Sequence, residues 1–140
     1  MKRYLIFAGV NPFVGGLLLL FATTVASGYW TDANGAKLAL FFVTFAKTLQ
    51  YSYVLGVVPA FMLGSIDDIL GHVRKMDPLV RMAVVGAAGY VAGELVHGFR
   101  GPDSGMVQFI IHGLSGFIPA MISSWLTHKC SEPPQAATST

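Results

Sequence analysis

Three ionisable side chains fall within otherwise apolar stretches in the second half of the chain. Glu94 and His97 precede a polar turn at residues 99–105, and His112 follows it. Lys47 adds a fourth ionisable group in an earlier apolar stretch. Such a group inside a bilayer costs at least about 2.5 kcal/mol, so it normally faces protein or water and has a partner. These residue types would suit proton transfer, solute binding or metal ligation.

The composition is typical of a membrane protein. The chain has 140 residues, of which 54% are apolar and only 11% are charged, whereas soluble domains carry about 25% charged residues. The net charge of +2 is small and no long basic run occurs, so the sequence does not indicate a nucleic-acid partner. The single cysteine, Cys130, excludes an internal disulfide framework.

Four apolar segments predict an all-α bundle of four transmembrane helices, since each is long enough to cross the hydrocarbon core. They cover residues 4–26, 38–64, 79–98 and 105–126. Asp77 followed by Pro78 is a typical helix start, with Asp as the N-cap and Pro at the first helical position. We expect one domain over residues 1–129 and a disordered cytoplasmic tail over residues 130–140.

The placement of lysine and arginine predicts the orientation. Six of these residues would lie on one side of the membrane: Lys2, Arg3, Arg74, Lys75, Arg81 and Lys129. Only Lys37 and Arg100 would lie on the other side. Because cytoplasmic loops are enriched in lysine and arginine, we expect a multi-pass protein of the inner membrane with both termini in the cytoplasm.

The most charged segment, residues 65–77, follows the second span. Its apolar residues recur at helical spacing, so we expect a short amphipathic extension at the membrane surface. Asp68 and His72 are four residues apart and could hold a cytoplasmic metal ion. We interpret these two residues, together with Asp67, as a solvated helix face instead.

The ionisable residues within the spans can be compared by their depth in the bilayer. At about 1.5 Å per residue, Lys47, Glu94 and His112 share a level in its outer half. We predict that Lys47 pairs with Glu94 and that His112 is within reach of one of them. Further polar residues complete the predicted intramembrane network: Gln50, His97 and Gln108. Such a network would fix which helix faces which, because a slip would leave a charge in hydrocarbon.

The same residues allow other interpretations. Glu94 and His112 could titrate along a proton or solute pathway, and the polar cluster could bind a quinone or a lipid. Glu94 and His97 have the spacing of di-iron helix bundles, but those sites need a second such motif and two further carboxylates. His97 and His112 differ in depth by about 7 Å, which is awkward for a haem with two histidine ligands. We therefore expect no metal and no cofactor.

A weak internal repeat links the two halves of the chain. Residues 56–60 (Gly-Val-Val-Pro-Ala) match residues 116–120 (Gly-Phe-Ile-Pro-Ala), and glycine and aromatic positions in residues 9–16 match those in residues 86–93. The matching spans run in the same direction, so the pattern indicates a parallel repeat of a helical hairpin.

Four short segments carry a family resemblance. They are Tyr29-Trp30-Thr31-Asp32, Lys47-Thr48-Leu49-Gln50-Tyr51, Ile66-Asp67-Asp68-Ile69-Leu70 and Arg100-Gly101-Pro102-Asp103-Ser104-Gly105. In these segments the chain resembles small uncharacterised inner-membrane proteins of alphaproteobacteria, rhizobia in particular. The resemblance covers nearly the whole chain and implies a bacterial inner-membrane protein with a domain of unknown function. It implies no catalytic residue.

For function, the absence of known catalytic motifs favours a protein that is not an enzyme. Gly89 and Gly93 have the spacing that lets two helices approach closely, so we predict a docking face for a partner helix. We therefore predict an accessory or scaffold component of a membrane complex, in contact with lipid and with itself or another membrane protein. The alternative is a small oligomeric transporter or proton-coupled carrier that uses Glu94 and His112.

Overall fold

The computed structural model describes residues 2–73, 76–97 and 105–131. They form four α-helices: α1 (Lys2–Ala26), α2 (Gly35–Val73), α3 (Pro78–His97) and α4 (Met106–Ser131). Each helix is long and apolar enough to cross a membrane, which confirms the predicted all-α fold. The predicted turn at residues 99–105 lies almost entirely outside the described residues. The same holds for the predicted tail, except that Cys130 and Ser131 belong to α4.

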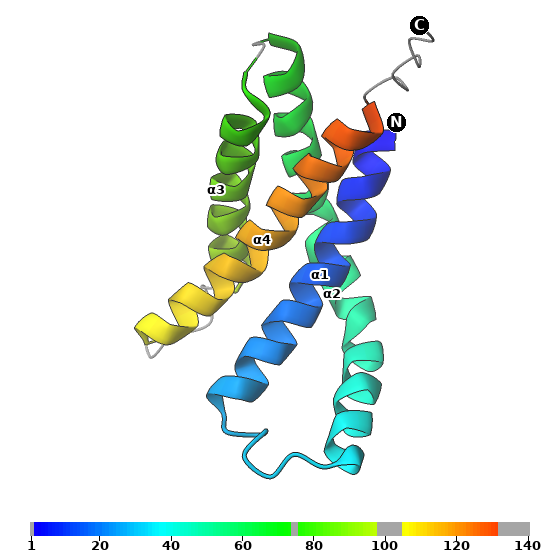
Figure 1. Ribbon diagram of the computed structural model, residues 1–140, viewed down its shortest axis with the longest axis vertical. Coiled ribbons are helices and arrows are strands. Elements are labelled where there is room, and N and C mark those ends of the chain that lie inside the picture. Colours follow the sequence, from blue (N-terminus) through cyan, green and yellow to red (C-terminus); the bar gives the residue numbers. More distant parts are fainter. Residues whose placement is uncertain (1, 74–75, 98–104, 132–140) are drawn as a thin grey trace, which may run out of the picture.

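The helices form two antiparallel hairpins, α1–α2 and α3–α4, which pack against each other through α1 and α4 (Figure 1). The end of α4 lies beside the start of α1, and the end of α2 and the start of α3 lie at the same end of the bundle. We call this the charged end, since it holds the ion pairs described below. From the charged end, α2 and α3 diverge toward the other end (Figure 1).

Helix α2 is longer than the predicted second span. Its 39 residues correspond to about 58 Å at about 1.5 Å per residue, nearly twice the roughly 30 Å of a hydrocarbon core. The segment from residue 65, predicted as a short amphipathic extension, belongs to the same helix as the predicted span at residues 38–64. The helix continues without a break to Val73, because side chains in its last turns form ion pairs and hydrogen bonds with all three other helices.

Local signals set the starts of two helices. Asp77 caps α3, since its Oδ1 accepts a hydrogen bond from the backbone N of Leu79 at 3.0 Å. This confirms the helix start predicted from Asp77 and Pro78. Asn34 caps α2 in the same way, through a 2.9 Å hydrogen bond from the backbone N of Lys37 to its side-chain oxygen.

Glycines bring α3 and α4 into backbone contact. A Cβ at Gly89 would lie 2.5 Å from the carbonyl oxygen of Gly116, and one at Gly93 would lie 2.5 Å from that of His112. No side chain fits at either position, so the helices approach as closely as glycine allows.

These contacts correct one prediction. Gly89 and Gly93 do form a helix-docking face, but the helix that occupies it is α4 of the same chain rather than a partner helix. Glycine spacing shows that a helix approaches closely, and it does not identify that helix.

We predict that Gly93→Ala destabilises the bundle by about 1–3 kcal/mol, because the added methyl group overpacks the crossing of α3 and α4. The free energy of unfolding in mixed detergent micelles measures this effect. Gly9→Ala is the matched control, since a Cβ at Gly9 would meet nothing within 4 Å. Equal stability of the two variants would show that the crossing is looser than described.

Candidate functional site

A cavity of about 320 Å³ lies between the four helices. This volume is at the lower end of the range of about 300–1,000 Å³ for small-molecule sites. Its lining is mostly apolar, with glycines and prolines where the helices approach each other and a few polar groups. The cavity is partly open, so a ligand could enter it without unfolding the bundle.

The lining of the cavity follows the sequence repeat. The lining residues of α3 are Gly89, Ala92, Gly93 and Val96. Their counterparts in α1 also line the cavity: Pro12, Gly15, Gly16 and Leu19. The lining residues of α4 are Ser115, Gly116 and Pro119, and their counterparts in α2 are Leu55, Gly56 and Pro59, which again line it. The cavity therefore lies at the interface between the two repeated hairpins.

Contacts inside each hairpin recur at equivalent positions. A Cβ at Gly16 would lie 2.5 Å from Oγ of Ser52, which joins α1 to α2. A Cβ at the equivalent Gly93 would lie 2.5 Å from the carbonyl oxygen of His112, the residue equivalent to Ser52. The repeat thus recurs in the packing as well as in the residue types, which supports the interpretation as a repeated hairpin.

Prolines release backbone acceptors beside the cavity. Proline has no N–H, so Pro59 and Pro119 cannot donate helix hydrogen bonds to the carbonyls of Leu55 and Ser115. Both of these residues line the cavity. The carbonyl of Ser115 faces α1, since a Cβ at Gly15 would lie 2.9 Å from its oxygen. A ligand with a hydrogen-bond donor would match these acceptors.

Polar side chains add further hydrogen-bonding groups to the cavity lining. Asn11, which lines it, accepts a 3.0 Å hydrogen bond at Oδ1 from Oγ of Ser123. The hydroxyls of Thr48, Ser52 and Ser115 donate to carbonyl oxygens of their own helices. Because a hydroxyl that donates keeps its lone pairs, each of these oxygens can still accept a hydrogen bond.

Among the described residues, the structure leaves part of the predicted intramembrane network outside the bundle interior. Three of its members are exposed: Lys47, Gln50 and Gln108. Glu94 and His112 are half-buried, and neither lines the cavity. The side chain of His97, the last residue of α3, lies outside the described part of the chain.

The predicted pairing of Lys47 with Glu94 is also missing. Across residues 2–73, 76–97 and 105–131, no ion pair joins these two side chains. Oε1 of Glu94 is buried and has no hydrogen-bond partner there. The depth argument placed both residues at one level along the helix axes, but it said nothing about rotation around each axis. Lys47 points away from the bundle.

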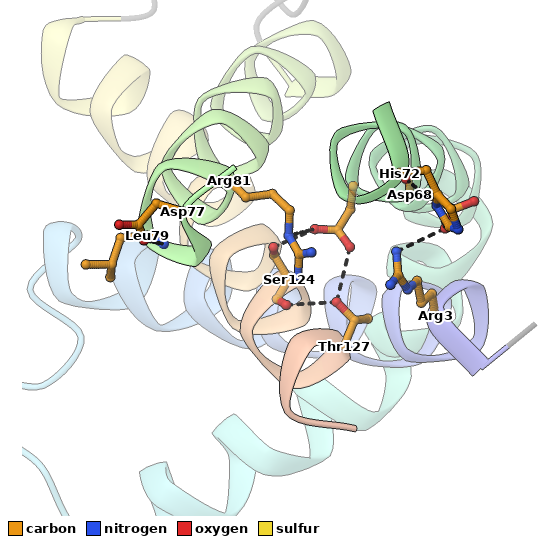
Figure 2. A network of polar contacts seen from close by, with 9 residues as sticks. Arg3, Asp68, His72, Asp77, Leu79, Arg81, Ser124 and Thr127 are labelled. Atoms are coloured by element: carbon orange, nitrogen blue, oxygen red, sulfur yellow. Dashed lines mark hydrogen bonds and ion pairs between the residues drawn. The ribbon is translucent and has the colours of Figure 1, made fainter. Parts of the chain in front are cut away.

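A buried polar cluster at the charged end joins three helices instead (Figure 2). Asp67 of α2 is fully buried. Its Oδ1 accepts a 2.6 Å hydrogen bond from Ser124, and its Oδ2 accepts a 3.2 Å hydrogen bond from Thr127, both on α4. Nε of Arg81, on α3, lies 3.2 Å from Oδ1. We call Asp67, Arg81, Ser124 and Thr127 the Asp67 cluster.

The adjacent residue extends these contacts to the first helix. Asp68 forms an ion pair with Arg3 of α1 at 3.0 Å, and its Oδ1 lies 3.3 Å from Nδ1 of His72 (Figure 2). Among the described residues, no group of three or more His, Cys, Asp or Glu side chains could hold a metal ion.

The predicted solvated face is therefore wrong for Asp67, which faces the other helices rather than water. One signal in the sequence could have revealed the cluster. Arg81 lies within the apolar third span, where a charged residue normally has a partner. The sequence-based prediction of orientation uses Arg81 only as a positive charge, and it assigns no partner to this charge.

Comparison with known proteins assigns the chain to a family. A family of unknown function, DUF5413, matches residues 1–133. The chain belongs to this family. The domain of unknown function that the sequence resemblance implied is thereby confirmed, together with a fold of four membrane-compatible helices.

Outside DUF5413, the similarity is partial. Over 73 residues the chain is 30% identical to a protein described as a probable tRNA sulfurtransferase of Lactobacillus acidophilus. The match covers 52% of this chain and only 18% of that protein, so it carries no functional argument. No solved structure matches the chain.

We predict that Asp67→Leu and Arg81→Leu each lower the free energy of unfolding by about 3–5 kcal/mol, because each leaves a buried charge without its partner. The double variant should recover part of this loss, since no lone charge remains.

A control cycle with Lys47→Met and Glu94→Gln should show no coupling, because these side chains do not form an ion pair. The measurement for every variant is the free energy of unfolding in mixed detergent micelles. Additive losses for Asp67→Leu and Arg81→Leu would show that the two charges are energetically independent.

Proposed function

We propose that this chain is a non-enzymatic membrane protein that binds a small apolar or amphiphilic ligand, such as a lipid tail, in the cavity between its two hairpins. The observation that carries the proposal is the cavity lining, to which the two repeats contribute equivalent residues. In membrane proteins built from repeats, ligand sites commonly lie at the interface between the repeats.

The chemistry of the lining supports an amphiphile rather than an ion or a strongly polar solute. Apolar side chains and glycines would contact a hydrocarbon chain, while the proline-released carbonyls of Leu55 and Ser115 would accept a hydrogen bond from a hydroxyl or amide group. Among the described residues that line the cavity, none is charged. The ligand would therefore enter from the lipid phase, through the open part of the cavity.

Within this proposal, the chain is an accessory component of a membrane complex and not an enzyme. The absence of known catalytic motifs from the sequence supports this proposal. A carrier that uses Glu94 and His112 has less support, because neither residue lines the cavity.

We further propose the bacterial inner membrane as the location, with both termini in the cytoplasm. The lysine and arginine bias of the sequence supports this orientation. The charged end, with Lys2, Arg3 and Arg81, would then face the cytoplasm.

The ligand proposal predicts that Ala92→Phe reduces lipid capture several-fold, because the ring would occupy the cavity. The measurement is the cross-linking yield of a photoactivatable fatty acid in membranes, together with native mass spectrometry of lipids that copurify. Ala87→Phe is the matched control, since Ala87 lies on the same helix and is exposed. If both variants capture as much lipid as the unmodified chain, the cavity is not the ligand site.

The orientation is testable with fusions to a reporter that is active only in the periplasm. We expect activity when the reporter follows Asn34, between α1 and α2, and none when it follows Lys129, near the end of α4. Reporter activity after Lys129 would reverse the proposed orientation.

A further inference from the structure

The cavity opens along one edge of α2. Two of the α2 residues that line it are exposed, Tyr51 by 63% and Leu55 by 51%. Toward the other edge of the α2 lining, Leu63 is buried. Exposure therefore falls from one side of the lining to the other around the helix axis. We call Tyr51 and Leu55 the mouth of the cavity.

Lys47 lies next to this mouth. It is one turn before Tyr51 and about 40° from it around the helix axis, at about 100° per residue. It also immediately precedes Thr48, the lining residue of α2 that is nearest the start of the helix. Lys47 is exposed, and within the described part of the chain no ion pair or hydrogen bond involves its side chain. A cation therefore stands at one end of an apolar cavity.

The position of Lys47 along α2 places this cation inside the bilayer. Phe41 lies near the level of the membrane surface, since the centre of its ring is 5.4 Å from that of Trp30 and tryptophan is enriched at that level. From Phe41 to Lys47 the helix descends by about 9 Å. Because a charged residue in a span normally pairs with another group, Lys47 favours an anionic partner at this depth.

From the level of Lys47 the cavity extends toward the charged end. Its lining along α2 runs from Thr48 to Leu63, a length of about 22 Å at about 1.5 Å per residue. The volume of about 320 Å³ is at the lower end of the range for small-molecule sites, which favours one hydrocarbon chain over the two of a phospholipid. A long apolar site with a cation at one end matches a single-chain amphiphile with an anionic head group.

We propose that the ligand of the cavity is a fatty acid, whose hydrocarbon chain lies along α2 and whose carboxylate pairs with Nζ of Lys47 beside the mouth. This inference rests on the proposed function and adds to it the chemical class of the ligand. An ammonium group forms a charge-assisted hydrogen bond with a carboxylate, and within the bilayer this pair is little screened by salt. Lys47 would therefore select a fatty acid over an uncharged amphiphile with the same chain.

The decisive variant is Lys47→Met, which removes the charge and keeps an unbranched side chain. Lys47→Arg keeps the charge and should keep the selectivity. Lys37→Met is the matched control, because it makes the same substitution on the same helix at a residue that does not line the cavity. Nζ of Lys37 donates a 3.2 Å hydrogen bond to the carbonyl oxygen of Tyr29 instead. Ala92→Phe, whose ring would occupy the cavity, tests the proposed function separately.

The measurement is the apparent dissociation constant of a photoactivatable fatty acid, and of the photoactivatable alcohol with the same chain, from cross-linking yields on the purified full chain. The experiment is done at about pH 8, where a carboxyl group in water is ionised. We expect the unmodified chain, Lys47→Arg and Lys37→Met to bind the acid about tenfold more tightly than the alcohol. In Lys47→Met we expect equal affinity for both probes, with the affinity for the alcohol unchanged.

The outcomes separate this inference from the proposed function. The inference alone is overturned if Ala92→Phe weakens the binding of both probes while Lys47→Met keeps the preference for the acid, or while the unmodified chain has no such preference. Both are overturned if Ala92→Phe binds both probes as tightly as the unmodified chain. Native mass spectrometry of the same samples gives the oligomeric state. If Lys47→Met converts a dimer into a monomer, a second copy of the chain is the partner of Lys47 and the inference is wrong.

Discussion

The buried carboxylate of Asp67 sets the arrangement of the helices at the charged end. A carboxylate without access to water is costly unless it is paired and hydrogen-bonded. Within the described part of the chain, the partners of Asp67 come from two other helices, namely Arg81 of α3 and the hydroxyls of Ser124 and Thr127 on α4. A rotation or slip of either helix would leave the charge uncompensated. The neighbouring Asp68–Arg3 pair adds α1, so all four helices are joined within about one turn of α2.

Away from the charged end, side-chain size decides how closely the helices approach. Gly89 and Gly93 allow α3 to contact the backbone of α4, and Gly16 gives α1 a close contact with the side chain of Ser52 on α2. Between α2 and α3 the only described ion pair is the one at the charged end, and the helices diverge beyond it (Figure 1). Tight contacts on some sides and divergence on another leave the central cavity.

The repeat explains how one carboxylate can hold two halves of the chain together. In the alignment that matches residues 56–60 with 116–120, Asp67 is equivalent to Thr127. These two side chains are hydrogen-bonded to each other, so equivalent positions of the two hairpins meet where the halves pack together. An acid on one side and a hydroxyl on the other form a hydrogen bond, whereas two acids would repel each other. The two hairpins therefore differ in residue type at the point where they meet.

The sequence by itself determined the number and type of helices, the cap at Asp77, the close approach at Gly89 and Gly93, and the repeat. These features depend on hydropathy, turn chemistry and side-chain size along a single segment. Only the tertiary structure decided that α4 fills the glycine face, that Asp67 is buried, and that Lys47 points outward. The sequence gives each residue's position along its helix axis, but the rotation of each helix depends on all of its packing contacts together. For that reason Lys47 and Glu94 share a level without forming a pair, while Asp67 and Arg81, on the same two helices, do form one.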